Sequence, residues 1–143
     1  MAGEAEEGRD RGYDIPSIAD LPWVELGVLT SAEELEQLLI KTDMPSYGSE
    51  SPRKHLGECA VLACAMHRQM VAVIDDGDAR AQARRRGIPL VTSMAIIAEA
   101  YKTLDDVDRE TAEQVYAALL ATGMRLPRVE SFIGWAYEME LLP

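Results

Sequence analysis

Apolar positions along the chain recur at two spacings, one typical of helices and one typical of strands, and short polar segments separate them. Three leucines at helical spacing predict an amphipathic helix: Leu35, Leu38 and Leu39. Ser31 and Glu34 are spaced as a capping box, which predicts that this helix begins near Ala32. The preceding segment, Trp23–Leu29, alternates and is rich in aromatic and β-branched residues, so it predicts a strand.

The middle of the chain is more apolar. Residues 55–69 are almost wholly apolar from Cys59 to Met66, which predicts a helix covered on most of its sides. Two short apolar segments, 70–75 and 88–93, are typical of parallel strands. A polar helix closed by Gly87 separates them, and three further helices are predicted at 94–103, 108–123 and 129–142.

Alternation of strands and helices predicts an α/β fold with a parallel sheet and right-handed crossovers. The length of 143 residues suits one domain over residues 1–143. Residues 1–12 are polar and charged, so they resemble either a disordered tail or the remnant of an early helix that stops at Gly8 or Gly12. Residues 128–143 are expected to hold the C-terminal helix.

Charge and cysteine content narrow the classes of protein. The net charge of −11 argues against a nonspecific nucleic-acid coat, but not against an enzyme that meets phosphates through a divalent cation. No membrane-spanning run or signal peptide is recognisable, so a cytoplasmic protein is expected, with no membrane partner. Cys59 and Cys64 lie on one predicted helix among apolar residues, and we expect buried free thiols.

Candidate chemistry gathers after the strand at 70–75. Asp75, Asp76 and Asp78 follow it directly, and ligands of parallel α/β sheets bind beyond the carboxyl ends of the strands. Hard carboxylate oxygens select Mg²⁺ or Mn²⁺. The alternative is a turn followed by a helix with Asp78 as its N-cap.

Glu58 is the single acidic residue in the apolar helix and must face water, a cation or a metal ion; alternatively, it is a first-turn acid that favours the helix dipole. A metal site made of His55, Glu58 and Cys59 is weakly indicated by their spacing. The run Arg84–Arg86 predicts a solvated helix end, with phosphate contact as the alternative. Thr92 and Ser93 also follow a strand; they could bind a metal water or phosphate, or Ser93 could cap the next helix.

The segment GECAVLACAMHRQMVAVIDDGDARAQARRRGIPLVTSMAIIAEAY, with the flanking LPWVEL and LLATGMRLP, resembles PIN-domain proteins over roughly Glu4 to Pro127. The resemblance implies a three-layer α/β/α fold and a Mg²⁺- or Mn²⁺-dependent ribonuclease. Many bacterial members are toxins of toxin–antitoxin modules, so an RNA substrate and an antitoxin partner are implied. It assigns the acidic site to Glu58, to Asp75 or Asp76, and to Glu4, with Asp78 peripheral.

The chain departs from the family pattern at its start. A PIN domain begins with a strand that ends in an Asp, and this sequence begins where the following early helix should finish, so the first strand is expected to be missing. Truncation, a partner that supplies the strand, or loss of catalysis would each explain this. Unpaired strand edges also favour a homo-oligomer. Two hypotheses follow: a metal-dependent ribonuclease, or a catalytically impaired module that acts through protein–protein interaction.

Overall fold

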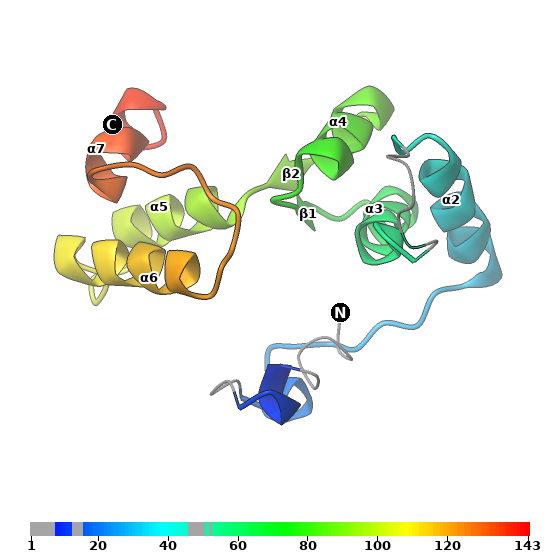
Figure 1. The fold of residues 1–143 in the computed structure, drawn as a ribbon, viewed down its shortest axis with the longest axis horizontal. Coiled ribbons are helices and arrows are strands. Elements are labelled where there is room, and N and C mark those ends of the chain that lie inside the picture. The colour runs from blue at the N-terminus through cyan, green and yellow to red at the C-terminus, as the bar shows by residue number, and fades with distance from the viewer. Residues whose placement is uncertain (1–7, 13–15, 46–50, 52) are drawn as a thin grey trace.

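The described part of the chain is an α/β fold dominated by helices (Figure 1). The structure is a computed structural model, and it describes residues 8–12, 16–45, 51 and 53–143. In chain order the elements are η1 (Ile18–Asp20), α2 (Ser31–Thr42), α3 (Leu56–Arg68), β1 (Ala72–Val73), α4 (Gly77–Arg86), β2 (Leu90–Val91), α5 (Ser93–Thr103), α6 (Arg109–Ala121) and α7 (Phe132–Glu138). The predicted fold class, α/β with a parallel sheet, is confirmed.

Strands β1 and β2 pair in parallel, with Ala72 opposite Leu90 and Val73 opposite Val91. The amide of Ala72 donates to the carbonyl of Pro89 at 2.9 Å, and the amide of Ile74 donates to that of Val91 at 3.0 Å. Helix α4 is the crossover between the two strands. Because the strands are parallel, their carboxyl ends lie at the same edge, and so do the starts of the helices that follow them.

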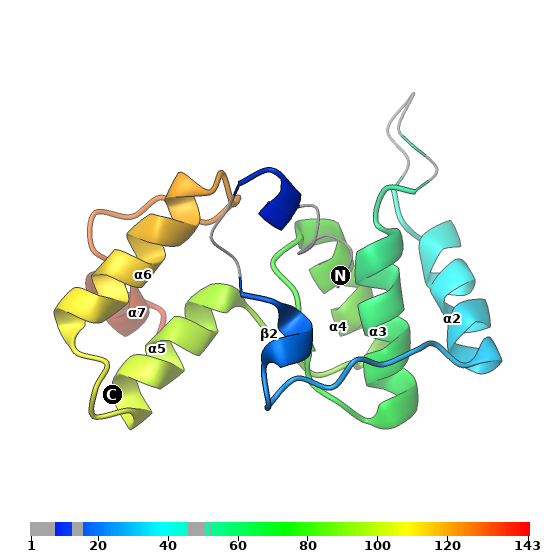
Figure 2. The same ribbon diagram turned by 90° about the horizontal axis from the view of Figure 1, so that it is seen from below.

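Helix α3 lies between α2 and α4 and forms the centre of the first apolar core (Figures 1 and 2). Cys59, Leu62 and Ala63 are completely buried, as the near-continuous apolar run predicts. On α4, Ala79 and Ala83 are equally buried, and their small side chains let the two helix backbones approach closely. The polar helix predicted over 78–87 therefore still contributes two alanines to the core.

Helices α5, α6 and α7 enclose a second apolar core (Figure 2). Phe132 is fully buried there and stacks on Tyr116, with ring centroids 5.7 Å apart. The carboxylate of Glu113 accepts hydrogen bonds from the Ser131 hydroxyl and from the amides of Phe132 and Ile133, so a side chain of α6 satisfies the first amides of α7.

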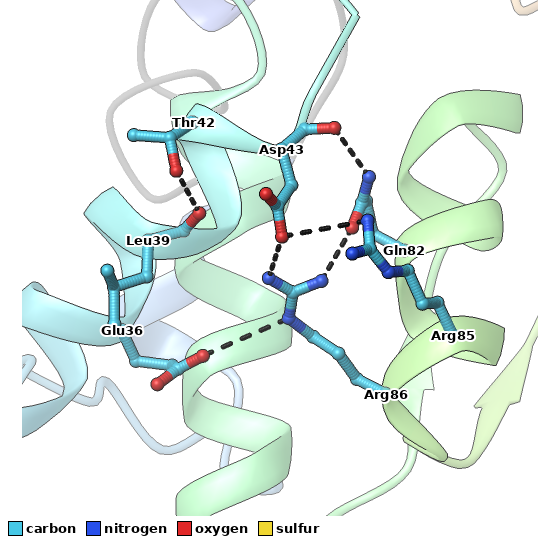
Figure 3. Close-up of polar contacts among 7 residues, drawn as sticks. All are labelled: Glu36, Leu39, Thr42, Asp43, Gln82, Arg85 and Arg86. Carbon is cyan, nitrogen blue, oxygen red and sulfur yellow. Dashed lines mark hydrogen bonds and ion pairs between the residues drawn. The ribbon is translucent and has the colours of Figure 1, made fainter.

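A polar network joins the end of α2 to α4 (Figure 3). Arg86 pairs with Asp43 at 2.7 Å and with Glu36 at 3.9 Å, and Gln82 donates to the Asp43 carbonyl at 2.7 Å. The guanidinium of Arg86 also donates to Gln82 at 2.6 Å. Within the predicted arginine run, Arg86 thus joins two helices, and Arg85 lies 3.8 Å from the same Asp43 carboxylate.

Three details differ from the sequence-based expectations. Residues 23–29 contain no strand; Trp23, Leu26 and Val28 are exposed, since the described chain offers this segment no strand to pair with. Helix α2 begins one residue early, because Thr30 and Glu33, and not Ser31 and Glu34, form the capping box. At the N-terminus, residues 8–10 are helical and Gly12 has a φ of 89°, which agrees with a helix that stops at Gly12.

Other expectations hold. Gly87 ends α4 in the left-handed region, with a φ of 66°. Both cysteines are free; Cys59 is buried and Cys64 is half-buried, and burial raises the pKa of each thiol. In the described residues, no helix is long and apolar enough to cross a membrane.

The capping glutamate of α2 also forms the main ion pair between α2 and α3. Arg68 donates to the two carboxylate oxygens of Glu33 at 2.6 and 2.8 Å, and to the Val28 carbonyl at 2.9 Å. Glu33 is buried, and its pKa is lowered to about 2, first by the hydrogen bond from Arg68 and then by the Thr30 amide. A bidentate arginine therefore holds α2, α3 and the segment before α2 together.

We predict that this ion pair makes stability depend on acid pH. The folded pKa of Glu33, about 2, lies below its ordinary value of 4.5, so its contribution is complete above pH 4.5 and is lost as the pH falls toward 2. Glu33→Gln should lower the free energy of unfolding at neutral pH and flatten its decline in this acid range. Urea denaturation at a series of pH values measures both effects. Glu34→Gln, an exposed neighbour on the same helix, should keep the wild-type curve; an unchanged slope in Glu33→Gln would contradict the prediction.

Candidate active site

The carboxyl ends of β1 and β2 bring the first turns of three helices together. Asp76 follows β1 and is the N-cap of α4, where its Oδ1 accepts the amide of Ala79 at 2.9 Å. Asp75 crosses to the start of α5, where its two oxygens accept the amide of Ser93 at 2.9 Å and the hydroxyl of Ser93 at 2.6 Å. One pair of neighbouring aspartates thus contacts two helix N-termini.

The third N-terminus belongs to α3. His55 is its N-cap residue, held in the left-handed region at a φ of 63°, and its Nδ1 lies 3.8 Å from Oδ1 of Asp76. Glu58 lies in the first turn of the same helix, partly buried. Because His55 reaches Asp76, the turn that carries Glu58 starts beside the tip of β1. The sequence-based hypothesis required this proximity of helix and strand end.

The His55 side chain is only 4% exposed, and neither of its ring nitrogens has a hydrogen-bond partner. An unsatisfied buried imidazole costs free energy, so this position is expensive unless something else offers His55 a partner. At 3.8 Å, the contact with Asp76 is too long for a hydrogen bond and would act as an ion pair when the ring is protonated.

The electrostatic balance of the cluster favours negative charge. Each helix N-terminus carries about half a positive elementary charge and unpaired amides. Asp75 and Asp76 use part of this potential, because both accept backbone amide protons of the helices that follow the strands. The same potential stabilises any further anion, including the phosphate of a nucleic acid, that approaches the strand ends.

The predicted site residues have different positions in this arrangement. Asp75, Asp76 and the turn of Glu58 lie at the strand ends. Asp78 lies in the first turn of α4 but is not its N-cap, as one sequence-based alternative had it; Asp76 has that role because its side chain reaches the Ala79 amide. Glu4 lies outside the described residues. Within the described ranges, no three His, Cys, Asp or Glu side chains are grouped closely enough to hold a metal ion.

Two features of the cluster were not apparent from the sequence. Thr92, and not Ser93, caps α5 by accepting the Ala95 amide, which leaves the Ser93 hydroxyl free to donate to Asp75. The burial of His55 beside Asp76 depends on its left-handed backbone, for which its place just before an apolar helix is a weak signal.

Comparison with known proteins gives a match at the level of the family. A family model described as a PIN domain matches residues 15–130, a range that includes both strands and every helix from η1 to α6. No curated protein and no solved structure matches the chain.

We predict that Asp76→Ala destabilises the fold by about 1 kcal/mol, because it removes the acceptor for the Ala79 amide at the start of α4. Asp76→Asn keeps a capping oxygen and should lose at most a few tenths of that amount. Urea denaturation at neutral pH gives both values. Equal stability of Asp76→Ala and the wild type would contradict the capping role.

Proposed function

This chain belongs to the PIN-domain family, and on that premise we propose that it is a metal-dependent endoribonuclease. The substrate is an RNA phosphodiester, and the site is the cluster at the ends of β1 and β2. In this proposal Glu58, Asp75 and Asp76 carry the chemistry, with Asp78 and Glu4 peripheral. We further propose that the enzyme is the toxin of a toxin–antitoxin module, held inactive by an antitoxin protein.

One observation supports the proposal most strongly. The contact of His55 with Asp76 brings the acid-bearing first turn of α3 to the aspartates at the tip of β1. Acidic groups from separate elements then share an edge of the sheet with three helix N-termini. A phosphodiester is attracted by helix N-termini, whereas a divalent cation is attracted by carboxylates, so the cluster offers both partners of phosphodiester hydrolysis a favourable potential.

The residues fit the implied cation in kind but not yet in number. Carboxylate oxygens are the ligands that Mg²⁺ and Mn²⁺ prefer. However, both oxygens of Asp75 already accept hydrogen bonds from Ser93, and the described residues alone form no three-ligand group. We therefore propose Glu4 as a further donor and derive no step of the reaction through the ion.

The described residues have separable tasks in the proposal. Asp75 fixes the start of α5 against β1, and Asp76 fixes the start of α4, so the amides of both helices point to the strand edge. Glu58 has no hydrogen bond in the described structure and is free to bind. A bound divalent cation supplies an activated water and neutralises phosphate charge, which matters in a chain of net charge −11.

We predict that the purified chain cleaves single-stranded RNA with Mn²⁺ and that Glu58→Gln lowers the rate by about 100-fold or more, because ligand loss exceeds the loss of an outer partner. The measurement is cleavage of a labelled RNA with Mn²⁺ and with excess chelator. Glu138→Gln, an exposed glutamate on α7, is the matched control and should keep full activity. Equal rates for Glu58→Gln and the wild type would exclude Glu58 from the mechanism.

A second function, a catalytically impaired module that acts through protein contacts, is favoured by a separate observation. Asp75 and Asp76 both have structural hydrogen bonds that need no metal ion. Calorimetric titration with Mn²⁺ distinguishes the two functions. The ribonuclease requires saturable binding that Glu58→Gln weakens, whereas the impaired module gives no saturable heat and no metal-dependent cleavage.

A further inference from the structure

Helix α2 exposes an apolar face that the described chain does not cover. Leu35, Leu38 and Leu39 are 61%, 57% and 50% exposed, although they sit in a well-formed helix. The opposite face, with Glu33 and Ile40, is buried against α3. Both views show α2 at the outer edge of the molecule, with α3 on its inner side (Figures 1 and 2). We call these three leucines the α2 leucine face.

The α2 leucine face is rigidly presented. At the start of α2, Glu33 is bound to Arg68 of α3, and at its end Asp43 is bound to Arg86 of α4. The Thr42 hydroxyl donates to the Leu39 carbonyl at 2.7 Å and completes the last turn (Figure 3). Because both ends of α2 are fixed, the leucines cannot turn inward without breaking ion pairs. A pre-organised apolar helix face loses little entropy when it binds a partner.

The charges beside the leucines indicate the partner. Glu34 and Lys41 are seven residues apart, two turns of helix, so they lie on the same flank of the face. Within the described residues neither has an ion-pair partner. A two-fold axis across the helix turns a second copy end for end and sets the same flanks against each other. Glu34 of each copy then meets Lys41 of the other, and the contact is made twice.

We propose that the α2 leucine face binds the same face of a second copy of this chain, with the two α2 helices antiparallel. The leucines supply the apolar contact, and the two Glu34–Lys41 pairs fix the orientation. A parallel pair would place Glu34 beside Leu39 and gain no ion pair. The two pairs also offset, at the interface, the repulsion between chains of net charge −11. The contact is small, so we expect a reversible dimer with a dissociation constant on the order of micromolar.

Sedimentation velocity of the full chain over a concentration series tests the proposal. The wild type should shift from monomer to dimer, and Leu38→Glu should remain monomeric at every concentration, with a dissociation constant raised at least about 100-fold. Since Leu38 is exposed, the variant should keep the wild-type circular dichroism and melting temperature. Leu104→Glu, a leucine of similar exposure (52%) after α5, is the control and should dimerise normally.

Charge reversal tests the orientation. Glu34→Lys and Lys41→Glu should each weaken the dimer about tenfold, because two exposed attractions become two repulsions. Combining both substitutions in one chain should restore the wild-type constant, since the positive and negative partners of each pair then exchange positions; a nonspecific apolar contact would not respond to the swap. A dimer that Leu38→Glu leaves intact, or a monomer at all concentrations, would overturn the proposal. Unchanged affinity in both single variants would overturn the antiparallel arrangement.

Discussion

The parallel pairing of β1 with β2 is the constraint on which the rest of the structure depends. Two residues on each strand are enough, because the hydrogen bonds extend beyond them to Pro89 and Ile74. Parallel strands deliver both carboxyl ends to one edge, and the next residues start α4 and α5 there. The Asp75–Ser93 and Asp76–Ala79 bonds then follow from short side chains that meet unpaired amides. The cluster is thus built from backbone direction first and from side-chain chemistry second.

The sequence predicted those elements that local interactions determine. The apolar helix α3, the closure of α4 at Gly87 and the two parallel strands appear close to their expected positions. The strand expected at Trp23–Leu29 does not form, because a strand needs a neighbour and local alternation carries no information on whether one exists. The capping box of α2 shifted by one residue since Glu33, unlike Glu34, also reaches Arg68 of α3.

The candidate site was predicted in outline for the same reason. Aspartates after an apolar strand are expected at a strand end, and Asp75 and Asp76 lie there. Which aspartate caps α4 depends on the backbone at the turn, and the spacing alone did not settle it. His55 was considered only as part of a weak metal motif. Its burial 3.8 Å from Asp76 is a tertiary contact between separate elements, which no local pattern encodes.

The two apolar cores, one around α3 and one around Phe132, have a consequence for how the molecule opens. The most extensive helix contacts fall within one core or the other, and the chain passes from the first to the second at Val91–Ser93. Native-state hydrogen exchange of such an arrangement follows two cooperative units with separate protection levels. The Asp75–Ser93 hydrogen bonds lie at the junction, so they set how far opening of one unit exposes the amides of the other.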